Sequence, residues 1–401
     1  MARELRVGII GGGIGGLALA GTLVGLGIET HLFERAPAFG EVGAGLQMTP
    51  NAVKVLRELG LWSEIHRVSF QPQSIVGRNW RTGHEIFRTP LMAECPRLYH
   101  AEFFHIHRAD LHRILLSLLP PSCRTLSAQC VSVSQTDESA TAHFADGRTF
   151  EADLIVGADG LQSVVRKTLF GDDAPRFTGN MCWRALIPFE EQPLEMVSPD
   201  ASFWLGPQGH VVTYYVSAGR AVNVVAIREA DSWVEESWNA PSDREELLAG
   251  YPHWHPNVLK LFSKAENIFK WGLFDRDPMT TWSAGRITLL GDAAHPMLPF
   301  LSQGAAMAIE DGYVLAQVLA AVNGIEAALK RYEALRLPRT SRVQLESRKR
   351  GETYHIASPF KRMYRDIAYR VKQMVDPHSS GLQAGWVYSY DAIAAVGKRM
   401  P

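Results

Sequence analysis

The chain opens with two short apolar runs that enclose a longer one. Val7, Ile9 and Ile10 lie in a run of the length and composition of a buried parallel strand, and a glycine-rich turn follows it. The longer run, Leu17–Leu26, predicts a helix, and Glu29–Phe33 predicts a second strand. This order of elements predicts a β-α-β unit at the start of a parallel sheet.

The glycines of the turn have the spacing of a dinucleotide-binding fingerprint. Gly11 allows the tight turn, Gly13 lets a pyrophosphate approach the backbone, and Gly16 lets the helix pack closely on the strand. Glu34 ends the second strand 18 residues after Gly16, where a carboxylate can bind the ribose hydroxyls of an adenosine. A signal peptide or membrane anchor is the alternative for this segment, but so many glycines would make a poor membrane helix.

Two later strands end in the same manner. Ala152–Val156 runs into Gly157-Ala158-Asp159-Gly160, and the apolar run after Arg286 ends on Gly291-Asp292. Aspartates at the carboxyl ends of parallel strands lie at the edge of a sheet that faces the ligand. The helix predicted at Gln303–Val322 begins with small residues, which leaves its first backbone N–H groups open to a ligand.

The middle of the chain has another character. Between Phe177 and Phe274, short runs of β-branched and aromatic residues predict an antiparallel or mixed sheet, and Ile75–Phe87 predicts a hairpin around Thr82-Gly83. We therefore expect a mixed α/β (α+β) fold, in which a Rossmann-like nucleotide-binding domain carries an inserted β domain. The expected boundaries are 1–72, 100–178 and 275–350 for the nucleotide-binding domain, 73–99 and 179–274 for the β domain, and 351–401 for C-terminal helices.

Composition narrows the function classes. The chain has 401 residues, with 41 Lys and Arg against 42 Asp and Glu, so its net charge of −1 gives no reason to expect a nucleic-acid or membrane partner. The four cysteines form neither a CxxC pair nor a metal-ligand spacing, which predicts reduced thiols in a cytoplasmic protein. His105 and His107 alternate along a predicted strand, but no carboxylate or cysteine cluster accompanies them, so we expect no metal site. The basic residues of the C-terminal segment are expected on a solvated helix face.

Four motifs together resemble one enzyme family. GGGIGG at the first turn, HRADL at His107–Leu111, GADG at Gly157–Gly160 and LLGDAAHPMLP at Leu289–Pro299 occur in the order found in flavin-dependent aromatic hydroxylases, the single-component FAD monooxygenases with the p-hydroxybenzoate hydroxylase fold. Four further stretches resemble the salicylate, 3-hydroxybenzoate and 6-hydroxynicotinate hydroxylases more narrowly: Phe39–Ala52, Ala306–Gly312, Tyr332–Arg339 and Trp386–Asp391.

The resemblance implies bound FAD, with NADH or NADPH as the electron donor. By analogy, Glu34 and the fingerprint glycines would bind the adenosine half, Arg108 the phosphate and ribitol region, Asp292 the ribitol, and Asp159 both FAD and the donor. The helix that begins near Gly304 would point at the pyrimidine edge of the flavin. The implied cofactor residues are Gly11, Gly13, Gly15, Gly16, Glu34, Arg35, Gly45, Leu46, Arg108, Asp159, Asp292, Gly304, Ala305 and Ala306.

The same resemblance implies the reaction. Dioxygen would add to the reduced flavin as a hydroperoxide, and one oxygen atom would pass to a phenolic or hydroxypyridine aromatic carboxylate. On the predicted strand that starts at His210, Tyr214 shares the face of that histidine, as in the substrate sites of related enzymes. We expect His210 to deprotonate or orient the substrate hydroxyl and Tyr214 to bind the ring or carboxylate. Arg184 could anchor the carboxylate or form an ion pair between domains.

One position departs from the family pattern. Salicylate and 6-hydroxynicotinate hydroxylases typically carry Pro-His where this chain has Pro299-Phe300, both expected in the substrate site. Because phenylalanine cannot transfer a proton, decarboxylative hydroxylation of the salicylate or 6-hydroxynicotinate type is an alternative rather than the main expectation. A flavin oxidase that takes electrons from its substrate is an alternative from another class. The resemblance leaves open whether the enzyme is a monomer or a homodimer.

Overall fold

The N-terminal β-α-β unit folds as the hydrophobic pattern predicts. The computed structural model describes residues 5–40, 44–232, 240–376 and 384–397, and its first elements are β1 (Arg6–Ile10), α1 (Ile14–Gly25) and β2 (Glu29–Phe33). β1 and β2 pair in parallel. α1 begins at Ile14, earlier than predicted, because the fingerprint glycines themselves form its first turn. Within the described ranges, no helix is long and apolar enough to cross a membrane.

A six-stranded sheet is built around this unit. Its order is β18-β19-β11-β1-β2-β7, and β18 alone pairs antiparallel. The added strands are β7 (Arg124–Thr125), β11 (Leu154–Gly157), β18 (Ser283–Ala284) and β19 (Ile287–Leu289). Ile10 lies opposite Gly157, and Gly157 lies opposite Leu289, so the carboxyl ends of three strands coincide. The residues that follow these ends therefore meet at one edge of the sheet.

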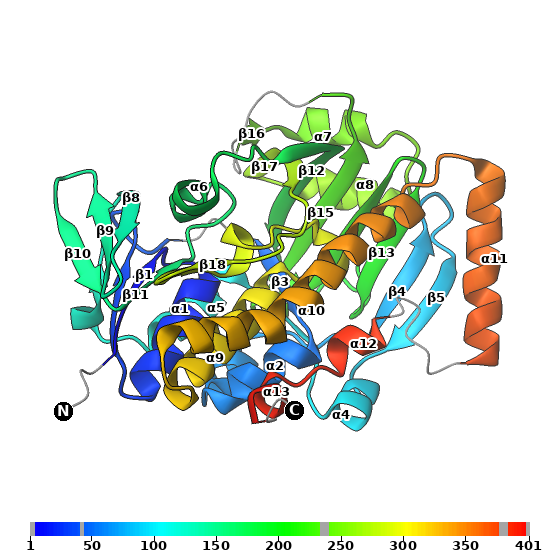
Figure 1. Cartoon of the computed structure of the whole chain (residues 1–401). Helices are drawn as coiled ribbons and strands as arrows, with labels where there is room; N and C mark the ends of the chain where they lie inside the picture. The colour runs from blue at the N-terminus through cyan, green and yellow to red at the C-terminus, as the bar shows by residue number, and fades with distance from the viewer. Residues whose placement is uncertain (1–4, 41–43, 233–239, 377–383, 398–401) are drawn as a thin grey trace.

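Helices cover one side of this sheet and a small second sheet covers the other (Figure 1). The helices are α1, α5 (Arg108–Leu116) and α9 (Gly304–Ala321), and the small sheet contains β8 (Cys130–Gln135), β9 (Ala140–Phe144) and β10 (Thr149–Ala152). α1 and α9 approach closely at two glycines. A Cβ atom on Gly15 would lie 3.0 Å from Ala308 Cβ of α9, and one on Gly312 would lie 2.6 Å from the backbone nitrogen of Leu19 of α1.

The second large element is an eight-stranded mixed sheet, as predicted. Its strands, in the order β16-β17-β12-β15-β14-β13-β4-β5, pair antiparallel except for β13 and β4. Their bounds are β4 (Ser74–Asn79), β5 (Glu85–Pro90), β12 (Arg176–Pro188), β13 (Ala201–Gly206), β14 (Gly209–Val216), β15 (Ala221–Glu229), β16 (Ala240–Ser242) and β17 (Ile268–Asp275). Helices α7 (Arg244–Gly250) and α8 (Pro256–Lys264) pack with the apolar residues of one face. The other face contacts the loop that contains Leu298 and Phe300.

A strand pair and a long helix link the two large sheets. β3 (Gly45–Met48) and β6 (Phe104–His107) form an antiparallel pair, and the long helix α10 (Ile325–Tyr354) runs from α9 towards the eight-stranded sheet (Figure 1). The boundary expected at residue 351 falls within α10, and the boundary expected at 179 falls within β12. The shorter helices are α2 (Pro50–Glu58), α3 (Trp62–Val68), α4 (Glu94–Tyr99) and α6 (Val164–Phe170).

The C-terminal helices are divided between the two sheets. α12 (Gly385–Tyr388) packs on α2, and α13 (Ala392–Gly397) packs on α2 and α9, whereas α11 (Pro359–Val375) packs against the edge strand β5. There, Arg88 N–H donates to Gln373 Oε1 over 2.8 Å, and Gln373 Nε2 donates to the Arg88 carbonyl. The side-chain amide thus occupies hydrogen-bonding groups that a further strand would use. Residues 377–383 and 398–401 of the expected C-terminal segment lie outside the described residues.

The expectation of a basic solvated face on this segment holds only in part for α11, on which Lys361 and Arg370 are exposed. Arg365 is buried and donates to the Thr353 carbonyl, and Arg370 donates to the Glu85 carbonyl. Apolar side chains also face solvent, with Phe360 79% exposed and Met374 80% exposed. Two arginines of α11 thus donate to backbone carbonyls of other segments, and the face that α11 turns to solvent is mixed rather than basic.

Gly312→Ala tests the close packing of α1 on α9. The new methyl group would meet backbone atoms of α1, which cannot rotate away, so we expect a loss of about 1–3 kcal/mol in the free energy of unfolding. Gly25→Ala is the matched control, because a Cβ atom there meets nothing within 4 Å and alanine favours the helix. Urea unfolding measures both variants. Equal midpoints for the two would show that the contact is not tight.

Candidate active site

The fingerprint glycines differ in what surrounds them. Gly11 has φ of 110°, and a Cβ atom on it would lie 2.3 Å from the Ala158 carbonyl oxygen. A Cβ atom on Gly16 would lie 2.0 Å from the Gly11 carbonyl oxygen, so both positions require glycine for the fold itself. A Cβ atom on Gly13 would meet nothing within 4 Å, which leaves room for a ligand against the backbone.

Glu34 lies next to this turn, at the end of β2. Its carboxylate accepts hydrogen bonds from Gly12 N–H over 2.8 Å and from Ala36 N–H over 2.9 Å. These two bonds fix the carboxylate between the turn and the strand end, where ribose hydroxyls could donate to its remaining lone pairs. Arg35, the next residue, is exposed.

Asp159 caps the helix that follows its strand. Its carboxylate accepts from Ser163 Oγ over 2.5 Å and from Val164 N–H over 2.8 Å, at the start of α6. Burial raises the pKa of Asp159, and these hydrogen bonds partly oppose that effect. The structure therefore gives the Asp-Gly motif a local role in holding α6 at the same edge of the sheet.

Asp292 and the start of α9 face one another. Asp292 lies in the 3₁₀ turn Gly291–Ala293, and a Cβ atom on Gly304 would be 4.0 Å from its Oδ1. Its side chain is accessible, yet surrounding protein raises the pKa of Asp292, while the charges of His295 and Arg108 lower it. The Gln303 side chain makes no capping hydrogen bond, so the first N–H groups of α9 can donate to a negatively charged hydrogen-bond acceptor.

These residues fit the parts of FAD. An acid beside the turn suits the ribose, the open backbone at Gly13 suits the pyrophosphate, and the uncapped helix suits the oxygen-rich pyrimidine edge of a flavin. Arg108 begins α5, and its N–H donates to the Ala44 carbonyl over 2.8 Å, which places it beside β3. β3 itself contains Gly45 and the half-buried Leu46. Residues 41–43, which precede β3, lie outside the described residues.

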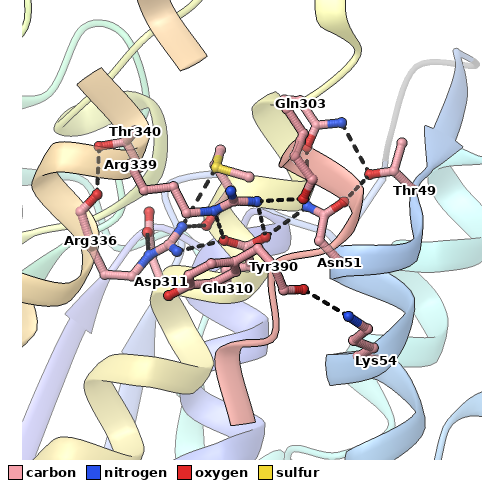
Figure 2. Close-up of polar contacts among 12 residues, drawn as sticks. Thr49, Asn51, Lys54, Gln303, Glu310, Asp311, Arg336, Arg339, Thr340 and Tyr390 are labelled. Carbon is pink, nitrogen blue, oxygen red and sulfur yellow. Dashed lines mark hydrogen bonds and ion pairs between the residues drawn. The ribbon is translucent and has the colours of Figure 1, made fainter. Parts of the chain in front are cut away.

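A buried cluster of charges lies between α9 and α10 (Figure 2). Glu310 and Asp311 on α9 face Arg336 and Arg339 on α10. Arg336 has no exposed surface, and it donates from Nη1 to Glu310 over 2.5 Å and from Nε to Asp311 over 2.7 Å. Arg339 donates to both Glu310 oxygens over 2.9 and 3.0 Å. Two carboxylates and two guanidinium groups thus balance in charge.

The cluster extends to the cofactor edge by hydrogen bonds. Asp311 accepts from Gly291 N–H over 3.1 Å and is paired with His295 Nε2 at 2.5 Å, which holds the turn that contains Asp292. Burial alone would raise the pKa of Asp311, but His295 and Arg336 outweigh it and lower the pKa to about 2. On the other side, Asn51 Nδ2 donates to Glu310 over 2.7 Å and to Gln303 over 3.1 Å. Gln303 is the N-cap residue of α9.

The substrate residues expected on the β domain share one face of the eight-stranded sheet. His210 and Tyr214 alternate along β14 with residues of the opposite, also buried face, and Tyr214 lies opposite Asn223 of β15. Gly45 N–H donates to Asn223 Oδ1 over 2.8 Å, and a Cβ atom on Gly45 would lie 2.8 Å from Tyr214 Cε2. Glycine is therefore required where β3 meets this face. Burial raises the pKa of Tyr214, whose ring centroid is 4.3 Å from that of His105.

Arg184 also points to this face, from β12. Its guanidinium carbon lies 5.0 Å from the centre of the Trp271 ring, and its charge acts on Tyr214. Among the described residues, no carboxylate pairs with it and its buried Nε has no hydrogen-bond partner. The expected alternative, an ion pair between domains, is thus not seen in the described part of the chain.

Phe300 closes this site from the loop before α9. Pro299 and Phe300 lie in the 3₁₀ turn Pro299–Leu301, and the ring centroid of Phe300 is 5.5 Å from that of His210. The ring packs on α10, where a Cβ atom on Gly351 would lie 2.5 Å from Phe300 Cε2. His210 Nδ1 is hydrogen-bonded to His355 Nε2 over 2.8 Å. Sequence reasoning missed His355, because its partner lies 145 residues away and no motif contains it.

Arg336→Leu tests the buried charge cluster. The substitution leaves two buried carboxylates with less compensating charge, so we expect a loss of about 3–5 kcal/mol in the free energy of unfolding. Arg342→Leu is the control, because Arg342 is an exposed arginine of the same helix that stacks on Trp386. Its expected loss is below about 1 kcal/mol. Similar losses in a urea titration of the two variants would contradict the importance of the cluster.

Comparisons with known proteins agree with this geometry. Residues 4–347 match the family model of the FAD binding domain. The chain is 42% identical over 395 residues to 3-amino-4-hydroxybenzoate 2-monooxygenase PtnB3 of Streptomyces platensis, covering 98% of both chains. It is 36% identical over 350 residues to 6-hydroxynicotinate 3-monooxygenase of Pseudomonas fluorescens, covering 86% of this chain and 90% of the relative.

A solved structure supports the same conclusion. A salicylate hydroxylase substrate complex superposes with a TM-score of 0.81 at 29% identity, covering 98% of this chain and 97% of the other. The mixed fold and the resemblance stated from the motifs are therefore confirmed, and the chain belongs to the family of FAD-dependent aromatic monooxygenases.

Proposed function

We propose that this enzyme hydroxylates a phenolic aromatic carboxylate, with NADH or NADPH as the electron donor and dioxygen as the oxidant. One observation carries the proposal. Arg184 has no carboxylate partner among the described residues, and it points to the same sheet face as His210 and Tyr214. A guanidinium group of this kind suits the carboxylate of a small planar acid.

The residues of this face have different roles in the proposed reaction. Bound FAD supplies the electron transfer and the activation of dioxygen. Arg184 binds the substrate carboxylate, Tyr214 packs against the ring, and His210 accepts the proton of the phenol, which makes the ring richer in electrons. Phe300 and its neighbour Leu298, both buried, exclude water from the reacting atoms.

The substrate class follows from the relatives and from Phe300. The first compound to test is 3-amino-4-hydroxybenzoate, the substrate named for PtnB3. Decarboxylative hydroxylation is the less favoured alternative, because Phe300 cannot itself transfer a proton at the position where salicylate and 6-hydroxynicotinate hydroxylases typically carry a histidine. The cytoplasmic location and the choice between monomer and homodimer stay predictions.

A screen of donor oxidation tests the reaction class. The purified yellow protein is mixed with NADH or NADPH in air, with 3-amino-4-hydroxybenzoate, 3- and 4-hydroxybenzoate, salicylate or 6-hydroxynicotinate, and the products are identified. Faster donor loss with a hydroxylated product that keeps its carboxylate supports the proposal. Loss of carbon dioxide would support the decarboxylative alternative. Bleaching of the flavin by the aromatic acid alone, without air or donor, would support an oxidase.

Arg184→Gln tests the carboxylate anchor. Losing a hydrogen-bonded charge pair of about 1.5–3 kcal/mol raises KM for the aromatic acid by about 10–150-fold, with a smaller change in kcat. The carboxamide analogue of the same acid should bind equally to both proteins, since it carries no charge. Arg220→Gln, at an exposed arginine of the same domain, is the control. An unchanged KM in the Arg184 variant would remove Arg184 from the substrate site.

His210→Ala tests the proton acceptor. Without it, we expect the rate of coupled hydroxylation to fall by about 10²–10⁴-fold, because the phenol keeps its proton. Donor oxidation should continue with release of hydrogen peroxide, so product formation and donor loss must be measured together. Full coupled hydroxylation by this variant, with normal FAD content, would rule out the role given to His210.

A further inference from the structure

His355 lies between the inner site and an open cleft. It is the residue that follows α10, it is 6% exposed, and it lines a cleft of about 720 Å³. Phe300 and Gly351 line the same cleft, together with the charged Arg348 and Glu352. His210 is 2% exposed and is not part of the lining. One histidine thus reaches the substrate face, and its hydrogen-bonded partner reaches solvent.

The aromatic rings that pack around His210 and His355 do not relay a proton between them. Phe300 packs against both imidazoles, with ring centroids 5.5 Å from each, and contributes only carbon atoms. The ring of Tyr354 lies 5.1 Å from His210, and burial raises the pKa of this phenol, so it keeps its proton. The charged residues on the cleft side are Arg176 and Arg228 of the sheet, Glu229 and Asp231 at the end of β15, Asp275 of β17, and Arg348 and Glu352 of α10.

We propose that His355 is a proton-relay residue, which passes the substrate proton from His210 to the water of this cleft. The proposal rests on the proposed function, because it concerns the fate of the proton that His210 takes from the phenol. It also supplies a proton-transferring partner beside Phe300, where related hydroxylases typically carry a histidine in place of the phenylalanine.

The proton can pass from the phenol to the cleft while both imidazoles remain neutral. At the start, His210 carries its proton on Nδ1, which donates to His355 Nε2, and His355 carries its proton on Nδ1. The phenol gives its proton to His210 Nε2, the Nδ1 proton of His210 moves to His355 Nε2, and the Nδ1 proton of His355 leaves to a cleft water. Both rings end as the opposite neutral tautomers, and proton exchange with solvent resets them.

The environment favours this neutral route. Burial lowers the pKa of His355 to about 4, and burial together with the neighbouring His355 lowers the pKa of His210 well below its ordinary value. Both imidazoles are therefore neutral at pH 7, when His210 has a free lone pair for the phenol proton. A route without a charged intermediate avoids the cost of a cation in an apolar site.

Two variants of the FAD-loaded enzyme test the proposal. His355→Gln can still accept a hydrogen bond from His210 but cannot relay a proton, so we expect KM within about 3-fold of wild type and hydroxylation slower by about 10-fold or more, using 3-amino-4-hydroxybenzoate. His355→Ala opens space beside the cleft, and added imidazole should restore at least half of the lost rate. His253→Gln, at an exposed histidine of the β domain, is the control and should match wild type.

The outcomes separate a relay from a purely structural contact. Wild-type hydroxylation by His355→Gln would overturn the proposal, since it would show that the hydrogen bond alone suffices. Normal FAD content in His355→Ala without imidazole rescue would also overturn it. If His355→Ala does not bind FAD, the glutamine variant decides. Absence of hydroxylation by the wild-type enzyme on every screened acid would instead overturn the proposed function, and this inference with it.

Discussion

The buried charge cluster of Glu310, Asp311, Arg336 and Arg339 is the constraint on which the remaining structure depends. Removing one member leaves an uncompensated charge in an apolar interior, which lowers the free energy of unfolding by more than the loss of most single contacts does. The cluster also fixes the position of the segments that line the cofactor site. Through Asp311 it holds the turn that contains Asp292, and through Asn51 it holds the N-cap of α9. Because both arginines lie on α10, the same ion pairs set where that helix ends, at the substrate face.

Local sequence patterns were sufficient to predict the fold. A fingerprint turn, a strand that stops on an aspartate and a run of β-branched residues each depend on neighbours in the chain, so their spacing carries the information. The placement of α11 does not depend on its own pattern. Its basic residues satisfy carbonyls of other segments, such as that of Glu85, and its apolar stripe is left outside. Amphipathicity alone predicted the helix but not which of its side chains contact the rest of the protein.

The candidate site could be predicted only in part, because local patterns do not show which distant segments meet. Side chains that share a strand face, such as His210 and Tyr214, follow from the two-residue period. The partners that decide their chemistry come from distant segments. Asn223 meets Gly45 across 178 residues, and His355 meets His210 across 145. Neither contact has a motif, whereas the acids and arginines of the buried cluster lie in motifs whose role became evident only when α9 and α10 were placed together.

The contact between Gly351 and Phe300 has a consequence for redesign of the enzyme. No Cβ atom fits at residue 351 while the phenylalanine ring occupies its present place, so the two positions share one volume. A smaller side chain at residue 300 would free space for a larger one at 351, and the reverse holds as well. A mutant library intended to widen the range of aromatic substrates should therefore vary these two codons jointly, because either one varied alone samples mainly clashes or voids.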